Sequence, residues 1–205
     1  MIATMKAPIN LNIAFGTLVE GGYYAGRIRT PEGDEYGILV APKASGQHKG
    51  SAWNRSLKRV DGALSFYDGL ANTRAMQEAG SKLAAWALGL QVNGFSDWYL
   101  PARDELELCY RHLKPGTETN WCYRGDNPSS VPPGYAYMPD VPAQTAIEEF
   151  RTGGTEAFDE VWYWTSTHYA GNDAYAWTQS FYYGGQYGIH KVDLNRARAV
   201  RRIKL

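Results

Sequence analysis

The stretch "DWYLPARDELEL", residues 97–108, decides how this sequence folds. It reads as a short strand that turns at Pro101 into a helix, and proline suits the first helical turn because an N–H there has no partner. Asp104 and Glu105 favour the positive end of the helix dipole. An apolar stripe at helical spacing follows at Leu106, Tyr110 and Leu113. We therefore expect a strand–turn–helix unit that ends at "KPG", residues 114–116.

The sequence before this unit predicts a β-hairpin and one long helix. Residues 22–41 place β-branched and aromatic residues on both sides of the turn "PEGD". A helix is predicted over residues 74–89, where Thr73 supplies the cap and apolar side chains recur at helical spacing. Residues 42–56 and 60–73 lack such a pattern, so we expect them to be irregular.

The sequence after this unit predicts a long loop and a series of strands. Residues 115–141 hold five of the ten prolines and show no periodicity, and a loop of this length in a compact domain is usually functional. Residues 143–154 predict a short helix, and four short strands follow between residues 161 and 205. A hairpin, helices, a loop and a β-meander in this order indicate an α+β fold with an antiparallel sheet.

Length and charge fit one globular domain. In these 205 residues we expect a single domain over residues 21–205, preceded by an arm over residues 1–20 that serves attachment or oligomerisation. The 21 basic and 21 acidic residues balance, which argues against nucleic-acid binding driven by overall charge. We expect no signal peptide and no membrane insertion. Cys109 and Cys122 are expected to be free thiols, with a single disulfide between them as the alternative.

Residues 97–106 resemble the signature D-W-R-L-P-T-x-x-E-L of the collagen-like adhesin C-terminal domain family, the Lcl C-terminal domain. The family's later strands resemble three segments here: Tyr163 to Thr167, Ala176 to Trp177, and Val200 to Arg202. The resemblance covers about residues 60–205, with Tyr99 where the family has Arg and Ala102 where Thr is common. It implies a C-type-lectin-like fold with an antiparallel sheet, two main helices and long irregular loops. It also implies a binding module that contacts its ligand through loops on one side of the final sheet.

Two tyrosine-rich segments supply the candidate binding residues. In "SFYYGGQYGIHK", residues 180–191, we expect Phe181 in the core and Gly184–Gly185 in a tight turn with positive φ. We expect residues 168–175 to form an adjacent loop, with residues 115–141 as a further contributor. Tyrosines among small polar residues are typical of adaptable binding surfaces; the alternative is that they only cap the sheet. The candidate ligand-binding residues are His168, Tyr169, Asn172, Asp173, Tyr175, Tyr182, Tyr183, Gln186, Tyr187 and His190.

Other residues are expected to be structural. The core is expected to contain Trp98, Trp164 and Trp177. Along the last strand, Arg201 shares a face with Ala199 and Ile203. A buried arginine needs a partner, and we expect Glu105 or Asp104 to be that partner. The opposite face carries Arg196, Arg198, Arg202 and Lys204. These four form either a solvated face or a basic stripe for anionic glycans.

No catalytic, metal-binding or cofactor-binding motif emerges. The four histidines are scattered, and the sequence has no nucleophile elbow, HExxH motif or Walker loop. Asn172–Asp173 and Asp126–Asn127 offer too few oxygen ligands for a lectin-type calcium site, so we expect no metal and no cofactor. Formylglycine-generating oxidases share the lectin-type fold but use a late cysteine pair, and no cysteine follows Cys122.

The resulting hypothesis is a phage-type binding protein. The stretches "GGYYAGRI" and "DGLANT" resemble phage or prophage versions of the domain. We expect a non-enzymatic tail or tail-tip protein of the virion, made in the host cytoplasm, that binds a carbohydrate or protein of the host cell surface. We also expect contacts with other virion subunits and a homo-oligomer, with a trimer favoured because multivalency strengthens weak sites. The alternatives are a structural virion component whose aromatic loops form a subunit interface and, third, a formylglycine-type oxidase.

Overall fold

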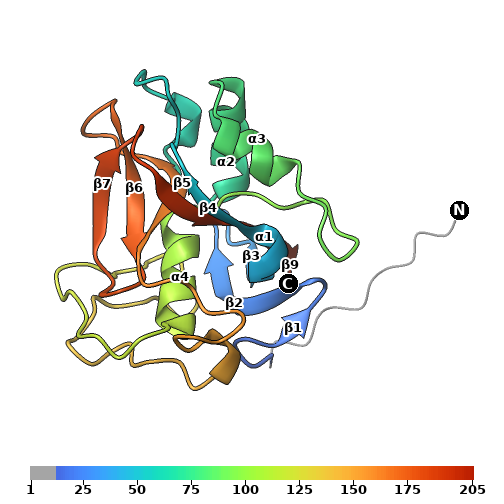
Figure 1. The fold of residues 1–205 in the computed structure, drawn as a ribbon, viewed down its shortest axis with the longest axis vertical. Coiled ribbons are helices and arrows are strands. Elements are labelled where there is room, and N and C mark those ends of the chain that lie inside the picture. Colours follow the sequence, from blue (N-terminus) through green and yellow to red (C-terminus); the bar gives the residue numbers. More distant parts are fainter. Residues whose placement is uncertain (1–12) are drawn as a thin grey trace, which may run out of the picture.

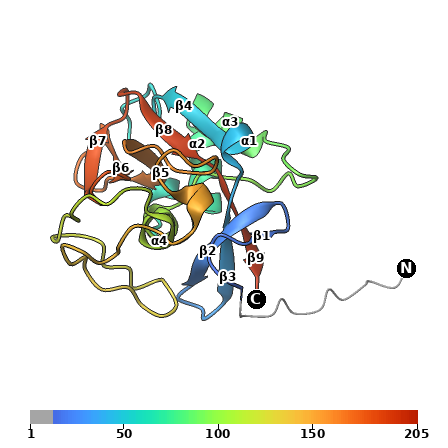
Figure 2. The same cartoon turned by 60° about the horizontal axis from the view of Figure 1, so that its bottom comes forward.

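The computed structural model describes residues 13–205, which fold into two β-sheets with helices packed on them (Figure 1, Figure 2). The first sheet has the order β1-β2-β3-β9 and comprises β1 (Leu18–Val19), β2 (Gly22–Arg29), β3 (Glu35–Val40) and β9 (Val200–Lys204). The second has the order β4-β8-β5-β6-β7 and comprises β4 (Gln47–Ser51), β8 (Asn195–Arg198), β5 (Trp162–His168), β6 (Tyr175–Ser180) and β7 (Gln186–His190). The α+β class is confirmed, and the C-type-lectin likeness stays a prediction.

The chain crosses from one sheet to the other between β8 and β9. Ala199 lies between these strands, where its N–H donates to Gly46 and its carbonyl accepts from Ala41. β8 pairs with β5 in parallel, whereas the other ladders among the described residues are antiparallel. The last of the four expected strands is therefore two strands, β8 and β9, and this segment joins the two sheets.

Three helices longer than one turn occur among residues 13–205: α2 (Gly69–Glu78), α3 (Lys82–Leu88) and α4 (Arg103–Leu113). The single helix expected over residues 74–89 is wrong. Gly80 adopts a φ of +85° and breaks the chain into two helices, and the Ser81 side chain caps α3. Asp68, rather than Thr73, caps α2.

The secondary structure predicted for two shorter segments is also wrong. Residues 42–56 contain α1 (Lys43–Gly46) and β4, which is held by its pairing with β8. Residues 143–154 form only the 3-10 turn Glu148–Phe150 instead of a helix. Thr145 in that segment hydrogen-bonds to the backbone of α4 and its C-terminal cap, so tertiary contacts override the local helical pattern.

The unit at residues 97–108 connects both sheets to α4. Tyr99 forms two backbone hydrogen bonds with Val200 of β9, of 2.8 and 2.9 Å. The Tyr99 hydroxyl donates to Glu105 Oε1 and the Ala102 N–H donates to Oε2, each at 2.8 Å. Burial raises the pKa of Glu105 to about 7. The turn and the helix are therefore present, with Glu105 capping the helix inside the protein, whereas the expected short strand is only a single β-bridge between Tyr99 and Val200.

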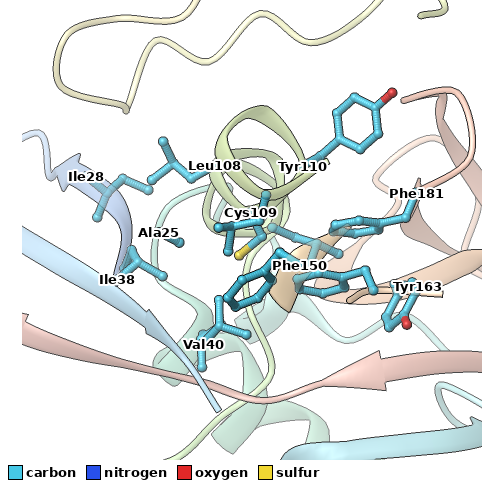
Figure 3. Close-up of a cluster of buried hydrophobic side chains, with 14 of the residues drawn as sticks. Ala25, Ile28, Ile38, Val40, Leu108, Cys109, Tyr110, Phe150, Tyr163 and Phe181 are labelled. Carbon is cyan, nitrogen blue, oxygen red and sulfur yellow. The ribbon is translucent and has the colours of Figure 1, made fainter. Parts of the chain in front are cut away.

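The main core surrounds α4, which contacts both sheets (Figure 3). Its apolar side chains pack against β2 and β3 and also against Tyr163 and Phe181. α4 covers one face of β5 and α2 the other, so Tyr163 and Trp164 are both buried in spite of their opposite parity. Trp98 is fully buried and Trp177 is 9% exposed, so the expected tryptophans lie in the core.

Part of the expected N-terminal arm belongs to the folded domain. Residues 13–20 include β1, which pairs with β2, and the Phe15 ring stacks on His112 with centroids 3.7 Å apart. Residues 1–12, the rest of that arm, lie outside the described residues. No helix between residues 13 and 205 is long and apolar enough to cross a membrane.

Candidate functional site

The tyrosine-rich segments lie at opposite ends of β6. We call the end of the sheet at the β6–β7 turn, residues 181–185, the turn end, and the end at the β5–β6 loop, residues 169–174, the loop end; each name includes the residues packed around that connection. β5, β6 and β7 are antiparallel neighbours, so successive connections fall at opposite ends, as Figure 1 shows. The expectation that these two loops form one site is therefore wrong, and the candidate residues divide into two groups.

The loop end holds His168, Tyr169, Asn172, Asp173, Tyr175 and His190. Tyr169 packs on Trp177 with ring centroids 5.0 Å apart, and Tyr175 packs on His190 at 5.5 Å. Asn172 and Asp173 are exposed, and the Asn172 side chain accepts the Ala174 N–H within its own turn. Most rings at this end thus face protein rather than solvent.

His168 is buried, although it was expected on an exposed loop. Neither of its ring nitrogens has a hydrogen-bond partner among the described residues. Burial, followed by the nearby charges of Lys191 and Arg59, lowers its pKa to about 4. Asp173 lies 4.0 Å from Nε2. His168 is therefore a neutral side chain at neutral pH and, being buried, presents no surface to solvent.

Aromatic faces at the loop end already carry cations from the protein itself. The Arg103 guanidinium lies 3.9 Å from the Phe66 centroid and 5.7 Å from that of Trp177. Arg124 lies 5.9 Å from the same Trp177 ring. Lys191 lies 4.8 Å from a further ring, that of buried Trp53. The aromatic rings at the loop end are thus covered by cationic side chains of the protein itself.

The turn end is rigidly built on the core. Phe181 points inward and stacks on Phe158 at 3.9 Å. Gly184 has a φ of +78°, and a Cβ there would lie 2.6 Å from the Tyr110 ring. A Cβ on Gly185 would lie 2.5 Å from the Tyr183 ring. The predicted positive φ is confirmed at Gly184 and wrong at Gly185, and at both positions a ring lies so close to the backbone that a Cβ would clash with it.

Five rings from separate segments meet at the turn end and form what we call the aromatic surface: Trp121, Trp162, Tyr182, Tyr183 and Tyr187. Trp162 contacts Tyr183 and Tyr187, each at 5.8 Å between centroids. Trp121, Tyr182 and Tyr187 keep 41, 43 and 38% of their surface exposed. The surface thus combines a fixed base with rings open to solvent.

The long loop is fastened to this surface, as expected for residues 115–141. The Trp121 N–H donates to the Tyr183 carbonyl at 2.8 Å. Asn120 Oδ1 accepts from the Tyr110 hydroxyl at 2.7 Å and from Lys114 Nζ at 2.8 Å. A hollow of about 390 Å³ lies between loop and turn, lined by Glu118, Thr119, Trp121, Tyr182, Tyr183 and Tyr187.

The residues predicted from the sequence at this end include one that is buried, and they omit three that belong to the aromatic surface or line the hollow. Gln186 is 1% exposed and donates to Gln179 at 2.9 Å, so it supports the strands rather than facing a ligand. Trp121 and Glu118 lie in the aperiodic loop, where no pattern predicts which side chains face outward. Trp162 shares its parity with buried Trp164, but it sits at the exposed start of β5.

The basic residues of the last strands all have acidic partners. Arg201 binds Asp97 through two hydrogen bonds of 2.7 and 2.9 Å, so the expected pairing with Glu105 or Asp104 is wrong. Asp97 begins the same motif, whereas Glu105 turns inward to Tyr99. The others pair as Arg196–Asp159, Arg198–Glu156, Arg202–Asp68 and Lys204–Asp34. Arg198 is fully buried, Arg196 and Arg202 are partly buried and Lys204 is exposed. The four residues therefore form neither a continuous solvated face nor an unpaired basic stripe.

Both cysteines are free, with Cys109 buried and Cys122 exposed. Burial raises the pKa of the Cys109 thiol, which keeps it protonated at neutral pH. Within residues 13–205, no group of three or more His, Cys, Asp or Glu side chains is arranged to hold a metal ion.

Comparison with known proteins identifies a family that the chain matches. The family model of the Lcl C-terminal domain matches residues 43–201. No curated protein matches the chain. The matched region contains all of the second sheet, α4, the long loop and the aromatic surface.

Proposed function

This chain belongs to the Lcl C-terminal domain family, an adhesin-like binding domain, and we propose that it is a non-enzymatic binding protein that contacts its ligand through the aromatic surface. One observation carries this proposal: rings from two segments far apart in the sequence, Trp121 and the tyrosines of residues 182–187, line one open hollow, and Trp162 packs against two of these tyrosines. Protein interiors use such rings to fill space, but here three of the five remain more than a third exposed.

The physical chemistry of the aromatic surface favours binding. Tyrosine and tryptophan present large contact areas with few rotatable bonds, so little conformational entropy is lost when a ligand binds. The tether between Trp121 and Tyr183 and the glycine contacts at the turn fix several rings beforehand. Preorganisation of this kind raises affinity by lowering the cost of ordering.

The proposal extends to a phage tail or tail-tip protein of the virion that recognises a carbohydrate or protein of the host cell surface. Its support is the resemblance of "GGYYAGRI" and "DGLANT" to phage versions of the domain and the suitability of aromatic rings for sugar faces. Self-association, with a trimer favoured, would multiply a weak single site.

Binding to candidate host cells and to a glycan array tests the proposal. We expect the double variant Tyr182→Ala/Tyr187→Ala to lose binding. Tyr135→Ala is the matched control, because Tyr135 is 85% exposed in the same long loop but lines a different groove. Equal binding by the double variant would contradict the proposal. If the wild type binds neither cells nor glycans but self-associates through these tyrosines, the surface is a subunit interface instead.

A further inference from the structure

The rings that line the hollow stand at steep angles to one another. The planes of Tyr182 and Tyr183 meet at 85° with centroids 6.0 Å apart. Trp121 meets Tyr183 at 68° and 6.4 Å. A flat sugar face stacks on one ring at a time, whereas rings at steep angles can together surround a compact, rounded group. The geometry therefore favours a small group that touches several ring faces at once.

The lining of the hollow also carries a negative charge. Glu118 lines it and is exposed. Its hydrogen bond to Tyr182 and its charge, with a smaller contribution from Glu160, raise the pKa of the Tyr182 phenol. None of the described residues that line the hollow is basic. Lys114 is buried, and its ammonium donates to the backbone carbonyl of Glu118 and to Asn120 inside the loop.

The ring faces of the aromatic surface lack cations of their own. Eleven contacts between a cationic side chain and an aromatic ring occur among residues 13–205. None of these contacts involves a ring of the aromatic surface. The face of an aromatic ring is negative because of its quadrupole and attracts cations. The open faces at the hollow are therefore available to a cation from outside the chain.

We propose that the hollow binds an organic ammonium group, quaternary or methylated, carried by the ligand. The positive charge lies over the faces of the surrounding rings, and the Glu118 carboxylate balances it. Such groups are the ligands that aromatic cages recognise through cation–π attraction. This inference rests on the proposed function, because it takes the aromatic surface to be the binding surface and adds the chemistry of the bound group.

Titration with choline and with its neutral tert-butyl analogue, in which carbon replaces nitrogen, tests the proposal. The two probes share a shape and differ in charge. Binding is followed by NMR on the indole N–H signals. We expect choline to shift the Trp121 signal at millimolar concentrations and the neutral analogue to bind about tenfold more weakly. Glu118→Gln should weaken choline binding about fivefold. Glu148→Gln, a change at another exposed acid, should leave it unchanged.

The outcomes separate this inference from the function on which it rests. Equal binding of both probes, or choline binding that Glu118→Gln does not weaken, overturns the cation site and leaves an aromatic binding surface. The absence of any choline response at tens of millimolar also overturns it, even if host-cell attachment still requires Tyr182 and Tyr187. If neither choline nor host-cell binding depends on these tyrosines, both proposals fail. Unchanged thermal unfolding of Glu118→Gln ensures that the comparison uses folded protein.

Discussion

The two ends of β6 carry the same kinds of side chain in different surroundings. At the loop end, Phe66 and Trp177 are covered by Arg103 and Arg124. At the turn end, no cationic side chain of residues 13–205 lies over a ring of the aromatic surface, and four of its five rings border an open hollow. An aromatic ring that already has an internal partner contributes to stability, and one that lacks a partner is available to a ligand. Composition alone cannot distinguish these uses, because both ends are rich in aromatic residues.

If the loop end is structural, removing its central cation should have the largest effect on stability. Arg103 hydrogen-bonds to buried Asp104 at 2.9 Å and covers Phe66. Arg103→Met leaves that carboxylate without its cation, so we expect a loss of about 3 kcal/mol in the free energy of unfolding, measured with urea. Arg124→Met is the control, since Arg124 is exposed above Trp177, and it should cost less than about 0.5 kcal/mol. Similar losses for both variants would contradict the comparison.

The rigidity of the turn end can be tested separately from its rings. Gly184→Ala places a side chain at positive φ and against the Tyr110 ring, so we expect a loss of about 2 kcal/mol in urea unfolding. Gly153→Ala is the control, because Gly153 also has a positive φ of +88° but has no atom near its would-be Cβ. It should cost about 1 kcal/mol. Equal losses in the two variants would mean that the Tyr110 ring does not restrict the side chain at position 184.

The sequence predicted the parts of this fold that depend on local pattern. The hairpin at residues 22–41, the start of α4 after Pro101 and the positive φ at Gly184 all follow from turn chemistry and periodicity. The partner of Arg201 could not be found in this way, because the choice between Asp97 and Glu105 depends on how two sheets meet. The separation of the two tyrosine-rich loops, by contrast, follows from the meander itself and could have been derived.

The candidate site could be predicted only in part, because half of it comes from a turn with a recognisable pattern and the rest from a loop without one. The tyrosines at 182, 183 and 187 lie beside a recognisable turn, so their position near a tip could be inferred. Trp121 and Glu118 reach the same place through hydrogen bonds between backbone atoms and buried amides. An aperiodic loop carries no signal of such contacts. The acidic character of the hollow was therefore invisible in the sequence.

Acid should weaken the loop end through His168. Its pKa is about 4 in the folded protein against 6.5 ordinarily. The unfolded chain thus takes up a proton first as pH falls through this window, and folded stability declines. Between about pH 7 and pH 4.5, we expect the wild type to lose about 2 kcal/mol more than His168→Leu. Glu105 has a raised pKa and acts in the opposite direction, but it is present in both proteins and cancels. Parallel stability curves in urea would contradict this assignment.

The smallest effect on stability is expected where the effect on binding is largest. Tyr182 is 43% exposed and contacts another ring of the surface edge-on, so Tyr182→Ala should change the free energy of unfolding by less than about 0.5 kcal/mol. Tyr169→Ala at the loop end removes a ring packed on Trp177 and should cost about 1 kcal/mol. Host-cell binding should respond in the reverse order, with Tyr182→Ala defective and Tyr169→Ala close to wild type. A Tyr182→Ala protein that is clearly destabilised would place this ring with the structural ones and remove the distinction between the two ends.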